Sequence, residues 1–364
     1  MSKGNFNSDD HLYMQVADGL EKMINEDVLK IGDKLPSVRV LSDEYGISMG
    51  TAFQAYYHLE GKGLIESRPK SGYYVRFNQR RFRELPRVIP PETFSHDVSV
   101  KEMIASIYSD IVSQNEKVIN FAMAVPDPSL LPIAKLNKSV MTVLRDNKFS
   151  CINYENTQGN PELRKQIAKL SFNWGGKVKP DEVLVTAGCL EAMTMCLRAV
   201  TQHGDMVAVE SPNYFGVFQA IESMGLKVVE ICSDPVMGLD LDCLQEAIDK
   251  FPIKACVVIP NFNNPLGCCM PDENKKTLVE MITKHNIPLI EDDIYGELYF
   301  GRNRPRTCKY YDTKGLVMHC ASLSKSLTPG YRIGWVIPGR FMEQVKQIKR
   351  ISNISTPSLT QAAV

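Results

Sequence analysis

The chain has 364 residues, of which 44% are hydrophobic and 23% are charged, and its formal net charge at pH 7 is zero. This length and apolar content indicate a soluble globular protein with two domains. Residues 1–11 are polar and no apolar run is long enough to span a bilayer, so we expect no signal peptide, no membrane contact and a cytoplasmic location.

The chain contains ten cysteines, which are scattered along it. Four of them lie in apolar segments: Cys189, Cys196, Cys256 and Cys320. This placement favours reduced, buried thiols over a disulfide framework. The adjacent pair Cys268 and Cys269 lacks the spacing of metal ligands, so we expect no metal site.

Three helices are predicted near the N-terminus. Apolar residues recur with a helical period over residues 12–25. Ser37 is a candidate N-cap for a short second helix that Gly46 ends, and Ser48 is a candidate N-cap for a third helix that ends at Gly61. Two helices joined by a tight turn that contains glycine make a helix-turn-helix.

A β-hairpin is predicted directly after the third helix, with strands over 64–68 and 73–77 joined by a turn at 69–72. Residues 68–87 hold seven Lys or Arg and one Glu, a local charge of +6. A helix that fits the major groove beside a basic wing that follows phosphates favours DNA binding over a merely solvated basic surface. The residues expected to face DNA are Arg39, Ser48, Met49, Thr51, Gln54, Arg68, Lys70 and Gly72.

This region resembles the winged-helix domain of GntR-type bacterial regulators over nearly its whole length, DKLPSVRVLSDEYGISMGTAFQAYYHLEGKGLIESRPKSGYYV. The resemblance implies operator DNA as a partner. After the serine at position 48 that family often has an arginine that reaches a base, whereas this chain has Met49. The operator sequence is therefore not carried over.

Residues 78–97 are rich in Arg and Pro and lack periodicity, which is typical of an extended linker. Apolar spacing predicts a helix over 103–112. We expect a DNA-binding domain at 1–77, a basic linker with this first helix at 78–117, and a second domain at 118–364.

The second domain alternates predicted strands with predicted helices. The strands are expected at 183–186, 206–209, 255–259, 287–290 and 316–319, and helices at 189–200 and 273–285. This alternation predicts an α/β domain with a mostly parallel sheet covered by helices. Ligands of such sheets bind beyond the carboxyl ends of the strands, so the residues that follow the strands are the candidate site.

Polar and aromatic side chains do follow these strands. Gly188 and Cys189 open a helix whose backbone N–H groups can bind a phosphate. Tyr214 can stack on a pyridine ring, and Asp292 can pair with a protonated ring nitrogen. The site would also contain two groups that can bond a phenolate, Asn264 and Tyr295, and a final motif with Ser322, Ser324, Lys325 and Arg332. That motif supplies an amine, hydroxyls and a guanidinium for phosphate.

Together these motifs resemble the fold-type I enzymes of the aspartate-aminotransferase superfamily, which use pyridoxal 5′-phosphate (PLP). The resemblance implies that Lys325 holds PLP as a Schiff base, that Asp292 contacts the ring nitrogen, and that Gly188, Cys189, Ser322, Ser324 and Arg332 contact the phosphate. It also places Tyr214 on the ring face, with Asn264 and Tyr295 at the ring oxygen. The segment NYENTQGNPELRKQIA matches one whose tyrosine, here Tyr154, reaches the neighbouring subunit's cofactor, which implies a homodimer.

A GntR-type DNA-binding domain fused to this fold resembles the MocR subfamily of regulators, in which the second domain senses PLP or an amino compound. The alternative is an aminotransferase with an accessory DNA-binding domain. A third interpretation, a DNA-binding module on a cofactor-free scaffold, is disfavoured because the cofactor positions keep competent chemistry.

Two features depart from the superfamily pattern. Ala124 stands where a glycine commonly lines the substrate pocket, and the chain ends at Val364, before the smaller domain that carries an arginine for the substrate carboxylate. We therefore expect an incomplete amino-acid pocket, which favours a sensor over a transaminase. The sequence indicates neither the effector nor whether the regulator activates or represses.

Overall fold

Two compact units make up the chain, Met1–Pro86 and Arg87–Val364. The computed structural model describes residues 11–26, 28–69, 71–76, 96–97, 124–146 and 152–364. The predicted boundaries at 77 and 117, the predicted helix over 103–112 and the DNA-facing Lys70 lie outside these ranges and stay predictions. Within the described ranges, no helix is both long enough and apolar enough to cross a membrane.

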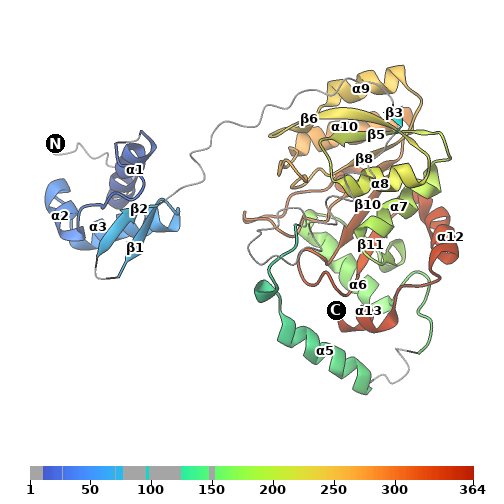
Figure 1. The fold of residues 1–364 in the computed structure, drawn as a ribbon, viewed down its shortest axis with the longest axis horizontal. Helices are drawn as coiled ribbons and strands as arrows, with labels where there is room; N and C mark the ends of the chain where they lie inside the picture. The colour runs from blue at the N-terminus through green and yellow to red at the C-terminus, as the bar shows by residue number, and fades with distance from the viewer. Residues whose placement is uncertain (1–10, 27, 70, 77–95, 98–123, 147–151) are drawn as a thin grey trace. The chain divides into compact units, whose positions relative to one another are not determined.

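The first unit contains three helices and a hairpin, drawn in blue in Figure 1. Its elements are α1 (Leu12–Asn25), α2 (Val38–Tyr45), α3 (Met49–Gly61), β1 (Ile65–Arg68) and β2 (Gly72–Val75). Both predicted caps are confirmed, since Ser37 Oγ accepts the Val40 N–H at 3.2 Å and Ser48 Oγ accepts the Thr51 N–H at 3.1 Å. Each serine thereby satisfies one of the amide groups that a helix leaves unpaired at its start.

Tyr56 of α3 contacts both the turn before α2 and the hairpin. Its side chain is completely buried, and its hydroxyl donates to the carbonyl of Pro36 at 2.6 Å, in the turn before α2. The ring also packs on Tyr73 of β2, with centroids 4.7 Å apart. The helices and the wing therefore share one core, and α3 is held by that core on one side while its other side faces solvent.

The second unit is built around one twisted sheet (Figure 1). Its strands are β3 (His96–Asp97), β4 (Leu184–Thr186), β5 (Met206–Ser211), β6 (Lys227–Asp234), β7 (Gly238–Leu239), β8 (Ile253–Val258), β9 (Leu289–Asp292), β10 (Val317–Ser322) and β11 (Gly334–Ile337). The order across the sheet is β3-β6-β5-β8-β9-β10-β11-β4, with β7 paired to β6. The central strands β6, β5, β8, β9 and β10 run parallel, which confirms the mostly parallel sheet.

The second unit also contains helices, most of which cover the two faces of this sheet. They are α5 (Ile133–Asp146), α6 (Pro161–Leu170), α7 (Cys189–Val200), α8 (Phe215–Ser223), α9 (Leu241–Lys250), α10 (Asp272–His285), α11 (Cys308–Tyr311), α12 (Met342–Ser352) and α13 (Ser358–Ala363), with 3₁₀ turns η2 (Pro128–Leu130), η3 (Ser171–Trp174), η4 (Pro180–Glu182) and η5 (Gly339–Phe341). Alternation along β5 fills two cores: Val207 and Val209 pack with α7, α8 and α12, while Ala208 packs with α9, α10 and α11.

The structure differs from the sequence-based expectation at the strand ends. Asp292 and Ser322 were expected in loops, but they are the last residues of β9 and β10, and both are buried. Two longer strands were not expected at all, namely β6 and the antiparallel β11. The prediction relied on apolar runs, and polar residues at the end of a buried strand break such a run. The backbone pairing of the strands continues through these residues, as where Asp292 lies opposite Cys320.

Candidate functional site

A cavity of about 250 Å³ lies where the carboxyl ends of the parallel strands meet the start of α7. Eight of the predicted cofactor residues line it: Cys189, Tyr214, Asn264, Asp292, Tyr295, Ser324, Lys325 and Arg332. Its apolar wall includes residues that the sequence reasoning did not propose, such as Leu190, Met193 and Phe215. Residues more than 100 positions apart in the chain are thus brought together by the parallel strand order.

Three predicted site residues are not among the lining residues of this cavity. Gly188 is the N-cap of α7, and a side chain there would run into the guanidinium of Arg332. Ser322 is buried beneath the lining, where its Oγ accepts the Ser324 N–H at 3.2 Å. Tyr154 is 82% exposed, so it stands at the surface of this chain rather than in this chain's own cavity.

Lys325 follows β10 and points its amine into the cavity wall. Its Nζ donates to the backbone carbonyl of Ala124 at 2.8 Å and lies 5.9 Å from the ring centre of Tyr295. Partial burial lowers the pKa of Lys325 below its ordinary value, and the charge of Arg332 lowers it further, while Asp292 acts in the opposite direction. A lysine whose neutral form is favoured is a better nucleophile towards a carbonyl.

Asp292 supplies a carboxylate that is 3% exposed at the end of β9. Its Oδ1 accepts two hydrogen bonds at 3.1 Å, from the thiol of Cys189 and from the backbone N–H of Ile294. Burial raises the pKa of Asp292 to about 6, because these two donors compensate only part of the lost hydration. A cationic partner in the cavity would therefore stabilise the charged form of this carboxylate.

The phenol of Tyr295 and the amide of Asn264 form a donor pair in the same wall. Asn264 Nδ2 donates to the Tyr295 oxygen at 3.2 Å, and burial raises the pKa of Tyr295 to about 12. The phenol therefore stays protonated at neutral pH. Two side chains with N–H and O–H groups in contact can both bond one anionic oxygen of a ligand.

The opposite end of the site suits an anion. Gly188 has φ +99° at the start of the twelve-residue helix α7, and Arg332, which is exposed, donates from Nη2 to the carbonyl of Ala187 at 3.0 Å. Gly188 fits because only glycine adopts this backbone conformation freely and leaves space for the guanidinium. A helix N-terminus beside an arginine attracts phosphate through both the helix dipole and charge-assisted hydrogen bonds.

A buried ionic network beneath the cavity was not predicted. Asp293 bonds Arg304 at 2.5 Å, His319 at 2.9 Å and Asn261 at 3.0 Å, which connects β10 with the segments that follow β8 and β9. Burial alone would raise the pKa of Asp293, but the His319 bond and the Arg304 charge lower it to about 2. The two adjacent aspartates thus have opposite environments: Asp293 is paired, and Asp292 faces the cavity. The only sequence signal was the pair of acids after a strand.

The first unit presents the predicted DNA-facing residues in different ways. Arg39, Ser48, Met49 and Gln54 are exposed on α2 and α3, whereas Thr51 is half-buried, with its hydroxyl 2.8 Å from Ser48 Oγ. Ser48 and Thr51 therefore stabilise the start of α3, whatever else they contact. The same helix exposes two aromatic residues that the sequence reasoning did not name, Phe53 at 51% and Tyr57 at 70%.

The hairpin, or wing, holds the guanidinium of Arg68 in a defined position. Arg68 stacks on the ring of Tyr74 at 4.2 Å and donates to Glu66 at 2.9 Å, so its guanidinium is held at the surface of the hairpin. Gly72 begins β2 with φ +108°, a conformation that favours glycine in the turn. An arginine pre-positioned by an aromatic ring loses less side-chain entropy when it contacts a phosphate.

Two family models match this chain, one in each part. Residues 12–75 match the family model described as bacterial regulatory proteins, gntR family, and residues 116–364 match the model described as aminotransferase class I and II. The solved structure of an archaeal alanine:glyoxylate aminotransferase is similar to 73% of the chain and 67% of its own, with a TM-score of 0.67 and 29% identity.

Two relatives from Escherichia coli K12 match both units. The uncharacterised HTH-type transcriptional regulator YdcR is 38% identical over 97% of this chain and 74% of its own length. The uncharacterised HTH-type transcriptional regulator YjiR is 37% identical over 96% of this chain and again 74% of its own. The chain therefore belongs to the GntR family of helix-turn-helix transcription regulators, in the MocR-like group that carries a fused aminotransferase class I and II domain.

Proposed function

We propose that the second unit holds PLP covalently at Lys325 and that the regulator senses PLP or an amino compound that reacts with it. The observation that carries this proposal is the convergence of an amine, a buried carboxylate and an arginine in one cavity. PLP would supply an electrophilic carbonyl for amines and an electron-withdrawing ring. The residues fit its three parts: Asp292 the ring nitrogen, Asn264 and Tyr295 the ring oxygen, and Gly188 with Arg332 the phosphate.

Other residues would complete this site. Tyr214 lines the cavity and would stack on the ring, while Cys189, Ser322 and Ser324 would contact the phosphate. Lys325 would exchange its bond to the Ala124 carbonyl for the cofactor. An amino effector would compete with Lys325 for the carbonyl of PLP. Its binding would release Lys325 and change the contacts of the cavity wall, so the unit would have two states, one with the effector and one without it.

We also propose that the regulator acts as a homodimer through the face that contains α5. None of the residues of α5 is buried, although Ile133, Met141 and Leu144 are apolar and between 41% and 66% exposed. Ile152 and Tyr154 add a further exposed pair beyond the helix. A second copy that covers this face would remove it from water and bring Tyr154 to the neighbouring cavity.

A dimer suits the DNA-binding unit, because two copies of α3 can read two half-sites of an operator. Arg39, Arg68, Lys70 and Gly72 would contact phosphates, and Met49 and Gln54 would contact base edges with support from Ser48 and Thr51. As a DNA-binding regulator of a bacterial family, the protein would work in the cytoplasm, where its operator lies.

Replacing Lys325 by Ala should abolish covalent attachment of PLP. After incubation with PLP and borohydride reduction, mass spectrometry of the wild type should find one added PLP on the peptide containing Lys325, whereas the variant should have none. Lys314→Ala, which changes an exposed lysine outside the cavity, is the matched control and should label like the wild type. Equal labelling of the Lys325→Ala variant would contradict the assignment, and steady amino-group transfer by the wild type would favour the aminotransferase alternative.

Replacing Asp292 by Asn should stabilise the PLP-free protein while it weakens PLP binding. The folded-state pKa of about 6 lies above the ordinary 3.8, so the carboxyl contributes stability at low pH that is lost as the pH rises through 6. The gain of the variant over the wild type should grow from about pH 4 and level off above pH 6 at about 3 kcal/mol. Urea unfolding across this range tests it. Asp181→Asn, at an exposed position, should give no such pH-dependent gain.

Replacing Met141 by Lys should shift the dimer towards monomer, because the new charge would lie in an apolar interface. Sedimentation velocity over a concentration series measures the shift. Val236→Lys replaces another exposed apolar residue, on the β6–β7 turn, and should leave the dimer intact. If both variants sediment like the wild type, α5 is not the interface.

Two DNA-unit variants should behave differently. Arg39→Ala should weaken binding to all sequences and lower the salt slope by about one, whereas Gln54→Ala should cost about 1–3 kcal/mol and relax preference at one base pair. Anisotropy with DNA from upstream of the gene, at several salt concentrations, separates the two effects. Lys22→Ala, at an exposed position of α1, is the control; if its losses match those of Arg39→Ala, the assigned DNA-facing surface is wrong.

A further inference from the structure

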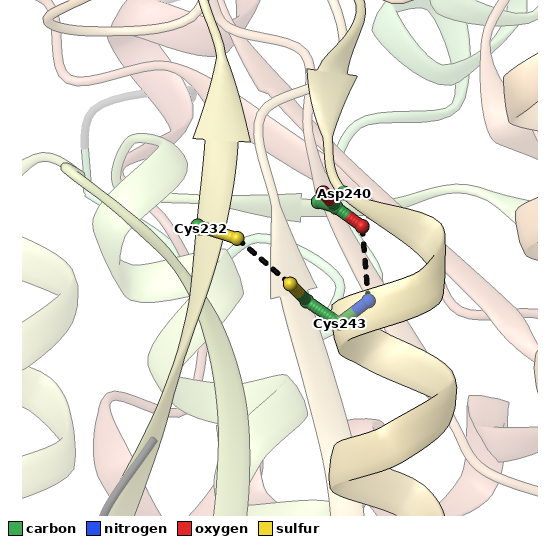
Figure 2. Close-up of side chains that lie close together, drawn as sticks. All are labelled: Cys232, Asp240 and Cys243. Atoms are coloured by element: carbon green, nitrogen blue, oxygen red, sulfur yellow. Dashed lines mark hydrogen bonds between the residues drawn. The ribbon is translucent and has the colours of Figure 1, made fainter. Parts of the chain in front are cut away.

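Two half-buried cysteines that the proposed function does not use lie in contact with each other. Figure 2 shows Cys232 on β6 and Cys243 in the first turn of α9 with their side chains pointing together, and the Sγ atoms are 2.9 Å apart. Neither residue lines the cavity described above. The only other thiol pair in hydrogen-bond contact among the described residues, Cys196 and Cys320, is 3.8 Å apart and completely buried.

Backbone hydrogen bonds hold the two cysteines in this position. The N–H of Asp240 donates to the carbonyl of Cys232 at 2.9 Å, and the carboxylate of Asp240 caps α9 by accepting the N–H of Cys243 at 2.9 Å. The β6–β7 hairpin, in which Ser233 pairs with Leu239, brings the chain back to this point. One residue thus clamps both cysteine backbones, so the approach of the thiols is a property of the local fold.

The geometry favours a disulfide over a metal ion. Two thiolates bound to tetrahedral zinc at about 2.3 Å each are about 3.8 Å apart, so zinc would force these sulfurs away from each other. A disulfide requires the sulfurs to come closer, to about 2.05 Å. Asp240, the third group of this cluster, already uses its carboxylate on α9.

We infer that Cys232 and Cys243 are an oxidisable dithiol that a peroxide converts to a reversible disulfide. The Cys232 sulfur attacks one peroxide oxygen, the O–O bond breaks, and a sulfenic acid and water result. The Cys243 sulfur then attacks that sulfenic sulfur, the S–O bond breaks, and its oxygen leaves as water with the Cys243 proton. Two sulfurs are oxidised, two peroxide oxygens are reduced, and a thiol reductant reverses the change.

The order of the two cysteines follows from their surroundings. Burial and the neighbouring Cys232 thiol together raise the pKa of Cys243 to about 12, so Cys243 keeps its proton at neutral pH and is assigned the second step. Cys232 is therefore assigned the first attack. The bond would tie α9 to β6 across a short loop, and closing such a loop restricts the unfolded chain and stabilises the fold.

The test treats the full-length protein with equimolar hydrogen peroxide, alkylates the remaining thiols and maps the peptides by mass spectrometry. We expect loss of two hydrogen atoms, a peptide linking Cys232 to Cys243, reversal by dithiothreitol, and a melting temperature higher by a few degrees. Cys196 and Cys320 should remain alkylatable after unfolding, which provides an internal control.

Two variants decide the mechanism. Cys243→Ser should leave a sulfenic acid at Cys232 that dimedone traps, and Cys232→Ser should leave Cys243 reduced; neither should gain thermal stability on oxidation. Stable sulfinic acid at Cys232 without the linked peptide would overturn the inference. So would one zinc ion per purified chain that both variants lose, since this would identify a metal site. Neither result depends on DNA or PLP binding.

Discussion

The candidate site depends on a carboxylate that is buried before any cation reaches it. Asp292 ends the central strand β9, between β8 and β10, where only 3% of its surface is exposed. Its two donors, the Cys189 thiol and the Ile294 amide, are weak compensation, and the pKa of Asp292 rises to about 6 as a result. The fold therefore maintains a poorly compensated carboxylate, and in the proposed function the protonated ring nitrogen of PLP would neutralise its charge.

The neighbouring aspartate makes this arrangement possible. Asp293 is bonded to Arg304, His319 and Asn261, and this network connects β10 with the segments that follow β8 and β9 without contributing to the cavity lining. These bonds hold Asp293 in place, and Asp293 directly follows Asp292. A binding site distinguishes similar ligands better when surrounding residues hold its side chains in fixed positions.

Ala124 lines the cavity and contacts Lys325 directly. Its backbone has φ +42°, a conformation that glycine adopts more easily, and its carbonyl accepts the Lys325 amine.

The DNA-binding unit has a hydrophobic core of its own, in which α1, α2, α3 and the hairpin pack around Tyr56.

Much of this protein was readable from its sequence, because local rules govern helix caps and strand order. Ser37 and Ser48 identified two helix starts, and the residues after each apolar strand identified eight of the lining residues, since parallel strands end at one edge of a sheet. The sequence did not reveal the Asp293 network, the contact of Lys325 with Ala124, or the thiol pair at Asp240. Those contacts join residues that are distant in the chain or that a hairpin brings together. Only the tertiary structure brings their atoms within bonding distance.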